Sequence, residues 1–266
     1  MIESIAIIGA GIIGSAMARI IARKKLVKKV VATRRRVEEI KDLEKYGVIV
    51  TKDNKWAARN SEVIVLAVKP YVLTEVLDEI RSEASGKLLI SVVAGIPIRY
   101  IEECIPNAKV VRAMPNIALI VGESFTVYSV SNKVTEKDKE FVDAFFSAMG
   151  LAFEVEEKLL NAYTGLTGSG PAYLAIFLEA MVFAGLKVGI PRDLALLGAA
   201  QVAIGAGKLI RDASMHYAKI KEMVVTPAGT TIEGIFELES TGLRRGLMRA
   251  VEAATRKANE LSEKYG

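Results

Sequence analysis

The feature that most constrains the fold is a glycine-rich turn near the start of the chain. A run of apolar residues at 4–8 is followed by glycines in the spacing G-x-G-x-x-G, and a helical pattern begins directly after them. In such a turn the first glycine permits a tight bend, the second admits a pyrophosphate, and the third lets helix and strand pack closely. The helix N-terminus adds a partial positive charge beneath the phosphates. The pattern predicts a dinucleotide-binding turn made of Ile8, Gly9, Ala10, Gly11, Ile12, Ile13 and Gly14. The alternative is a strand–helix turn that needs its glycines for packing alone.

Apolar runs typical of buried strands alternate with helical patterns through the first half of the chain. This alternation predicts an α/β fold, a Rossmann-type doubly wound parallel sheet, over residues 1–155. The expected strands are Ser4–Ile8, Lys29–Ala32, Val48–Thr51, Glu62–Ala67, Leu88–Val93, Val110–Met114 and Thr126–Ser129, and the expected helices are Ile13–Lys24, Val37–Tyr46, Pro70–Ser82 and Glu136–Met149.

The second half, residues 156–266, contains helical patterns and no expected strand. Two of its segments, Ala172–Leu186 and Leu194–Ile210, are apolar nearly all round, which is typical of helices buried on every side. Because about 110 residues cannot cover them fully, we expect an all-helical C-terminal dimerisation domain and an obligate homodimer. The alternative is a helix pair packed inside a monomer. The expected helices are Leu159–Gly165, Pro171–Gly185, Arg192–Asp212, Tyr217–Val224, Thr230–Glu239 and Leu243–Lys264.

The residues after the second strand indicate which dinucleotide is bound. An NAD site normally carries an acid there to bind the ribose hydroxyls, whereas this chain has Thr33, Arg34 and Arg35. A hydroxyl and two planar guanidinium groups suit a 2′-phosphate, so we expect NADP(H), with NAD(H) at lower preference. The alternative is a solvated basic helix start, and Arg36 is expected to be solvated in either case.

Further cofactor-binding residues are expected where strands end. Parallel strands bring their carboxyl ends to one edge of the sheet, where such folds bind ligands. Small residues there leave room for the nicotinamide ribose, and Asn54 is expected to reach the adenosine. The strand-end residues are Ala67, Val68, Lys69, Pro70, Ala94 and Gly95.

Composition narrows the partners. The net charge is +5 and the basic residues are scattered, so we expect an anionic small molecule and no nucleic acid. Cys104 and His216 are the only residues of their types, which excludes intrachain disulfides and argues against a metal site. No apolar run reaches about 18 residues and no secretory signal is evident, so we expect a cytoplasmic protein without a membrane partner.

Three clusters of unusual composition indicate a second site. They are Arg112–Asn116, Thr164–Tyr173 and Thr226–Thr231. The last places hydroxyls and backbone N–H groups at the start of a helix, which suits a bound carboxylate. The alternative is a threonine-capped helix start, but capping alone does not require Pro-Ala-Gly before two threonines.

With these clusters on view, the sequence resembles the pyrroline-5-carboxylate reductases, which make proline. GxGxxG, AVKP, a strand ending in Ala-Gly, MPN, TGxxGSGPAY and TPxGTT occur in that family's order and spacing over essentially the whole chain. One departure is Ala228, where the family usually has glycine, and this alanine restricts the backbone of the carboxylate loop. A second departure is that residues 34–36 are richer in arginine than the family requires.

The resemblance implies an NADPH-dependent reduction of 1-pyrroline-5-carboxylate to L-proline, by hydride transfer to C5. It implies that the Thr231 hydroxyl bonds the ring nitrogen as the catalytic residue, and that the backbone amides of Thr230 and Thr231, with Thr226 beside them, cradle the substrate carboxylate. Glu157 matches a substrate-contacting acid of some members, with Glu156 as its alternative. Asn116, as a substrate contact, and Met114 match the loop beneath the nicotinamide. In the family, the loop of one subunit completes a site formed with the other, and rings of dimers also occur.

Three rival functions remain open from the sequence. β-Hydroxyacid dehydrogenases also join a Rossmann half to a helical half, but they carry a catalytic lysine near the place where this chain has Leu174. An imine reductase acting on another ring would share most of the motifs. A non-catalytic NADP sensor would keep the glycine turn but would not need TPxGTT.

Overall fold

The computed structural model describes residues 2–265 and divides the chain into two compact units. One unit holds the residues up to Ser169 together with those from Val251 onward, and the other holds Gly170–Ala250. This division differs from the one predicted from the sequence at residue 155, because the first turns of the helical half and the end of the last helix pack with the sheet. The functional division into residues 1–155 and 156–266 stays a prediction.

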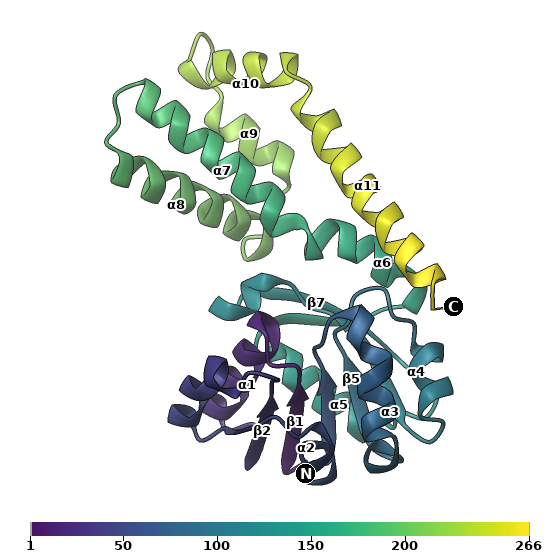
Figure 1. Cartoon of the computed structure of the whole chain (residues 1–266). Coiled ribbons are helices and arrows are strands. Elements are labelled where there is room, and N and C mark those ends of the chain that lie inside the picture. Colours follow the sequence, from purple (N-terminus) through teal and green to yellow (C-terminus); the bar gives the residue numbers. More distant parts are fainter. Residues whose placement is uncertain (1, 266) are drawn as a thin grey trace. The chain divides into compact units, whose positions relative to one another are not determined.

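The first unit is built on an eight-stranded sheet in the order β3-β2-β1-β4-β5-β6-β7-β8 (Figure 1). Neighbouring strands are parallel except β6 and β7, so β7 and β8 run against the other six. Short hydrophobic runs form the strands because both faces of the sheet are covered. The strands are β1 (Ser4–Ile8), β2 (Lys29–Thr33), β3 (Ile49–Thr51), β4 (Val63–Leu66), β5 (Leu88–Ser91), β6 (Lys109–Met114), β7 (Ser124–Val130) and β8 (Gly150–Glu154).

Alternate residues of the central strands enter two separate cores. On β4, Val63 and Val65 pack into one core while Ile64 and Leu66 pack into the other. The first core takes side chains from α1 (Ile12–Lys24), the 3-10 helix η1 (Val37–Tyr46) and α5 (Glu136–Ser147). The second takes them from α2 (Asn54–Arg59), α3 (Leu73–Ala84) and α4 (Ile98–Cys104). Helices thus cover both faces, and the doubly wound sheet is confirmed.

Some predicted boundaries and elements were wrong. The helices α2 and α4 were not predicted because they are short, and the strand β8 was not predicted because it lacks the all-apolar run of a central strand. Residues Val37–Tyr46 form a 3-10 helix, and the predicted helix at Pro70 begins with the 3-10 turn η2 (Pro70–Val72). Another 3-10 turn, η3 (Ile117–Val121), joins β6 to β7.

The rest of the chain after β8 is helical, as predicted. The 3-10 turn η4 (Glu157–Leu159) and α6 (Leu160–Tyr163) lead into a π-helical segment, η5 (Thr164–Gly168). The second unit follows, and the last helix begins in it and ends in the first. The remaining helices are α7 (Gly170–Lys187), α8 (Arg192–Arg211), α9 (Tyr217–Val224), α10 (Thr230–Ser240) and α11 (Leu243–Glu263).

Apolar side chains of the second unit lie largely on its surface. The buried cluster there is small and consists of Val182, Ala195 and Ala199. By contrast, Ile176 is 67% exposed and Leu197 65% exposed on the two long helices α7 and α8. Two segments, Glu157–Lys187 and Arg192–Arg211, are long and apolar enough to cross a membrane by length and composition, with mean hydropathy 1.5 and 1.4. Faces this apolar need a covering partner.

Candidate active site

The glycine-rich turn joins β1 to α1 at the carboxyl edge of the sheet. Gly9 has φ +89°, and a Cβ there would lie 2.5 Å from Val68 Cγ1 at the end of β4. At Gly14 a Cβ would lie 2.9 Å from the Gly9 carbonyl oxygen and 3.2 Å from Ile7, so helix and strand pack too closely for a side chain. At Gly11 the nearest atom would be 4.0 Å away, which leaves open space beside the helix start. The three glycines therefore occupy three different environments, and that of Gly11 suits a ligand.

The N-terminus of α1 is free to meet an anion. Its N-cap residue is Gly11, with no side-chain hydrogen bond to the first turn and no acidic residue within it. The turn is held from the other side by β2, since Gly9 and Ala10 both donate to the Thr33 carbonyl, at 3.2 and 2.7 Å. The fixed turn and the uncapped helix start together present backbone N–H groups and a positive helix end, which suit a pyrophosphate.

A cavity of about 220 Å³ opens beside this turn. It lies among the carboxyl ends of β1 to β4 and the first turns of α3. Seven of its residues were predicted to bind cofactor, and five were not. The predicted ones are Ile8, Gly9, Thr33, Arg34, Arg35, Asn54 and Val68, and the others are Lys52, Val72, Glu75, Val76 and Glu79.

The arginine run is held by carboxylates. Glu39 binds Arg34 through one oxygen and Arg36 Nε through the other, the latter at 2.6 Å. Arg34 also donates to the Ala10 carbonyl of the glycine-rich turn at 3.2 Å, so its guanidinium lies against the cradle. Arg35 pairs with Glu75 of α3 at 3.2 Å, and both side chains are about three-quarters exposed. Arg34 therefore makes the more protected contacts, whereas the ion pair of Arg35 lies in solvent.

The floor of the cavity is a chain of polar contacts. The buried Thr33 hydroxyl donates to Asn54 Oδ1 at 2.6 Å, and the Asn54 amide donates to Glu79 at 2.8 Å. Asn54 thus lines the cavity, and its contact with the adenosine stays a prediction. The Thr33 hydroxyl is engaged within the protein, and its contact with a cofactor phosphate stays a prediction.

The ends of β4 and β5 carry the other predicted cofactor residues. Ala67 donates to the Ile8 carbonyl at 2.8 Å, which brings the residues from Ala67 to Pro70 alongside the glycine-rich turn. At Gly95, φ is +75° and a Cβ would lie 2.9 Å from Leu261 Cβ, so α11 packs directly on this turn. A larger residue at position 95 would displace the last helix.

The loop after β6 rests on the π-helical segment η5. Asn116 donates from its side-chain amide to the Thr167 carbonyl at 3.0 Å, and its Oδ1 accepts from Ala118 N at 3.1 Å. Met114 lies so close to Gly168 that a Cβ there would be 2.8 Å from Met114 Cε. A π-turn leaves carbonyls without their usual helical partners, and such turns are common at functional sites. The motif that includes Thr164–Gly168 thus supports the loop of Met114 and Asn116.

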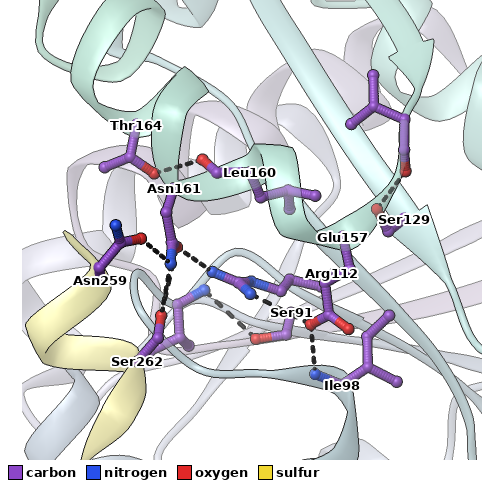
Figure 2. Close-up of polar contacts among 12 residues, drawn as sticks. Ser91, Ile98, Arg112, Ser129, Glu157, Leu160, Asn161, Thr164, Asn259 and Ser262 are labelled. Carbon is purple, nitrogen blue, oxygen red and sulfur yellow. Dashed lines mark hydrogen bonds and ion pairs between the residues drawn. The ribbon is translucent and has the colours of Figure 1, made fainter. Parts of the chain in front are cut away.

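A buried arginine ties this region together (Figure 2). Arg112, on β6, donates to Glu157 Oε1 at 3.2 Å and to Asn161 Oδ1 at 2.7 Å. Burial lowers the pKa of the Arg112 guanidinium from its ordinary value, and the hydrogen bond and charge of Glu157 oppose that shift. Figure 2 also shows the Asn161 amide reaching α11, where it donates to Asn259 at 2.9 Å and to Ser262 at 3.1 Å.

Glu157 has a structural role in this network. The same oxygen, Oε1, accepts from the Ile98 backbone N–H at 2.8 Å and from Arg112. These bonds hold the start of α4 and the turn η4 against the sheet. Its predicted contact with substrate stays a prediction.

In the second unit, residues Thr226–Thr231 form a tight turn followed by α10. Gly229 N donates to the Thr226 carbonyl at 3.0 Å, and Ala228 has φ +54° at the third position of the turn. The N-cap of α10 is Gly229, with no side-chain hydrogen bond to the helix, so the threonines do not cap it. The first N–H groups of α10 and the hydroxyls of Thr230 and Thr231 are therefore available to a ligand.

Comparison with known proteins agrees with this geometry. The family model for pyrroline-5-carboxylate reductase dimerisation matches residues 157–261, and that for NADP oxidoreductase, coenzyme F420-dependent, matches residues 4–95. The pyrroline-5-carboxylate reductase of Synechocystis is 40% identical over 262 residues, covering 97% of this chain and 98% of that one. That of Methanosarcina acetivorans is 39% identical over 267 residues, covering 98% and 99%. The crystal structure of the Plasmodium falciparum pyrroline carboxylate reductase with NADP bound has a TM-score of 0.90 at 31% identity, covering 98% of each chain.

The chain belongs to the pyrroline-5-carboxylate reductase family. The predicted resemblance is thereby confirmed, and the β-hydroxyacid dehydrogenase alternative is set aside. His216, the only histidine of the sequence, is the N-cap of α9 and accepts from Ala218 N at 3.3 Å.

Several residues that line the cofactor cavity were not predicted from the sequence. Lys52, Glu75 and Glu79 line the cofactor cavity but lie in no recognisable motif. A signal for Lys52 did exist, because it directly follows the third strand, at the same sheet edge as Arg34. Arg112 was noted only as part of a cluster, and its place on a buried strand was the signal for a structural role.

Proposed function

We propose that this chain is a pyrroline-5-carboxylate reductase. It reduces the cyclic imine 1-pyrroline-5-carboxylate to L-proline with NADPH, which is the last step of proline biosynthesis. The observation that carries the proposal is the full-length relationship to reductases of this name, at about 40% identity. Residues aligned over the whole chain include both the cofactor turn and the TPxGTT motif.

The residues at the sheet edge fit NADP(H). Open space at Gly11 and an uncapped α1 suit a pyrophosphate, and the cavity next to them, with Arg34 at its rim, suits an adenosine bearing a 2′-phosphate. The hydride that reduces the C=N bond at C5 is supplied by NADPH when it is bound. The protein contributes position and electrostatics to that step.

The second unit supplies the substrate's polar contacts. A carboxylate placed at the start of α10 meets free N–H groups and the positive end of the helix dipole. The backbone N–H groups of Thr230 and Thr231 form that cradle, with Thr226 beside them. The Thr231 hydroxyl orients the ring nitrogen and passes it a proton from water. A protonated imine is already electrophilic, so a strong general acid is not required. In the first unit, Asn116 and Glu157 are proposed as substrate contacts and Met114 as a contact of the nicotinamide.

The apolar faces of α7 and α8 are covered by a second copy of the chain. Their exposure in the single chain matches the dimerisation model that covers residues 157–261. A homodimer buries these faces without a membrane, and we place the protein in the cytoplasm. Rings of dimers are a further stage of assembly in this proposal.

An absorbance assay tests the proposed function. The full-length protein is mixed with NADPH and 1-pyrroline-5-carboxylate, and the decrease in NADPH absorbance and the appearance of proline are followed together. Loss of NADPH with equimolar proline is expected. A protein that binds NADPH but leaves it unoxidised would instead be a sensor, or a reductase of another ring.

A further inference from the structure

The rim of the cofactor cavity carries three cations, and they differ in one respect. Arg34 is paired with Glu39 and Arg35 with Glu75. Lys52 lines the same cavity, yet among residues 2–265 it forms no ion pair. The charges of the two arginines are therefore partly neutralised by carboxylates, whereas the charge of Lys52 is not.

The backbone places Lys52 beside Arg34. Strands β2 and β3 are parallel and pair Thr33 with Thr51, and Arg34 N donates to the Thr51 carbonyl at 3.2 Å. Arg34 and Lys52 are the next residues on each strand. They leave neighbouring strands at the same level and the same edge, about 5 Å apart along the sheet.

We propose that Lys52 binds the 2′-phosphate of NADP(H) and, with Arg34 and Arg35, sets the preference of this chain for NADP(H) over NAD(H). The inference rests on the proposed use of NADP(H), and it assigns a residue that no motif of the sequence singles out. A ribose phosphate carries between one and two negative charges at neutral pH, which a carboxylate-paired arginine offsets only in part.

The acidic residues around the cavity support this role of Lys52. Glu75 and Glu79 also line it, and Glu79 is bonded to the Asn54 amide. Two carboxylates repel a phosphate, so an unpaired cation is needed to make the rim attractive to it. Without the phosphate the same lysine has nothing to bind, which is why its effect should appear for NADP(H) alone.

The test uses nucleotide fragments that bind without the nicotinamide. Affinities of the intact protein for 2′,5′-ADP and for 5′-AMP are measured by calorimetry, for the wild type and for Lys52→Met. Lys52→Met is expected to weaken 2′,5′-ADP by roughly five- to tenfold, the effect of losing one charge-assisted contact at an exposed site. Binding of 5′-AMP is expected to stay within about twofold.

Two further variants serve as controls. Lys52→Arg keeps the charge and should bind 2′,5′-ADP as the wild type does. Lys55→Met removes another exposed lysine three residues along, on α2 and outside the cavity, and should change neither affinity. Adding salt should reduce the difference between the wild type and Lys52→Met, because exposed charges are screened.

Two results would overturn the assignment. They are an unchanged affinity of Lys52→Met for 2′,5′-ADP, and an equal loss for 2′,5′-ADP and 5′-AMP. Neither result bears on whether the wild type oxidises NADPH with 1-pyrroline-5-carboxylate. Conversely, failure of that oxidation would remove the proposed function and leave the fragment measurements standing.

Discussion

The guanidinium of Arg112 and the carboxylate of Glu157 meet at 3.2 Å in the first compact unit, one on a central strand and the other 45 residues later on a 3-10 turn. The arginine side chain is 7% exposed and the glutamate 35%. Because Arg112 also bonds Asn161, and Asn161 bonds α11, one buried cation fixes the sheet, the start of the helical half and the last helix. Replacing either residue should therefore lower the stability of the fold more than it lowers the catalytic rate.

Replacing Arg112 by Met should destabilise the protein by about 2–4 kcal/mol, since it strands the polar groups of Glu157 and Asn161. Glu157→Gln keeps an oxygen for Ile98 N–H and should cost about 1 kcal/mol. Denaturant unfolding of both single variants and the double variant gives the coupling, expected to be about 1 kcal/mol because the second change removes less than the first. A coupling near zero would mean that the pair does not act as a unit.

Kinetics of Glu157→Gln separate support from substrate contact. If the side chain only supports the fold, KM for the imine should stay within about threefold of the wild type at a temperature where both are folded. A rise of KM by a factor of ten or more would instead favour the contact implied by the family resemblance.

Gly11 and Gly14 lie in one motif but should respond differently to alanine. Gly14→Ala puts a methyl group 2.9 Å from the Gly9 carbonyl oxygen and should destabilise the protein by about 1–3 kcal/mol. Gly11→Ala meets no atom closer than 4.0 Å and should unfold within about 2 °C of the wild type. It should still weaken NADP+ binding at least about tenfold, because the methyl group fills the space left for the pyrophosphate.

Thermal unfolding with and without NADP+ measures both effects at once. Gly11→Ala should lose most of the stabilisation that the nucleotide gives while keeping its own unfolding temperature. Wild-type stabilisation by NADP+ in Gly11→Ala would show that the open space at this glycine is not the pyrophosphate site.

The fold was predicted best from the sequence where the spacing of residues specifies a local structure. The spacing of Gly9, Gly11 and Gly14 between an apolar run and a helical pattern is typical of a strand–turn–helix unit. The doubly wound core was predicted from this unit and from the other apolar runs. The strand β8 was missed because it ends the sheet, and its Leu151 and Phe153 are 42% and 48% exposed, without the all-apolar run of a central strand. Neighbours across strands, such as Arg34 and Lys52, depend on pairing register, which no local pattern gives.

At the turn Thr226–Gly229 of the proposed substrate site, too, the sequence pattern did not indicate which residue is closely packed. Ala228 departs from the family's usual glycine, yet its φ of +54° shows that the turn keeps the left-handed conformation glycine would adopt. Gly229 is the residue that packing requires, because a Cβ there would lie 2.3 Å from Thr226 Oγ1. The motif departs from the family at position 228, whereas the close contact in the structure is at position 229.

Stability should fall at low pH through Asp138. Burial alone would raise the pKa of this carboxyl, but hydrogen bonds from Lys109 at 2.8 Å and from Thr135 hold it below its usual value. A folded-state pKa below the unfolded one, about 3.9, gives stability that is present above pH 4 and is lost as the pH falls through the folded value. Unfolding midpoints between pH 2.5 and 7 should therefore drop most steeply below pH 4.

Asp138→Asn isolates this contribution. The variant should be less stable by about 1 kcal/mol at pH 7, where the ion pair with Lys109 is lost, and this difference should shrink as the pH falls below 4. Parallel curves for the two proteins across the whole range would assign the acid sensitivity to other carboxyls.

Thr231 carries the proposed chemistry, and its hydroxyl makes no hydrogen bond within residues 2–265, so Thr231→Ala should fold as the wild type does. Its kcat/KM should fall by one or more orders of magnitude, since groups that handle protons contribute roughly 10²–10⁴. Thr230→Ala is the matched control, because that residue is proposed to act through its backbone N–H, and Thr231→Ser should restore much of the rate. NADP+ affinity should be the same in all three. Equal rates for Thr231→Ala and Thr230→Ala would remove the hydroxyl from the mechanism and leave the start of α10 as a carboxylate site only.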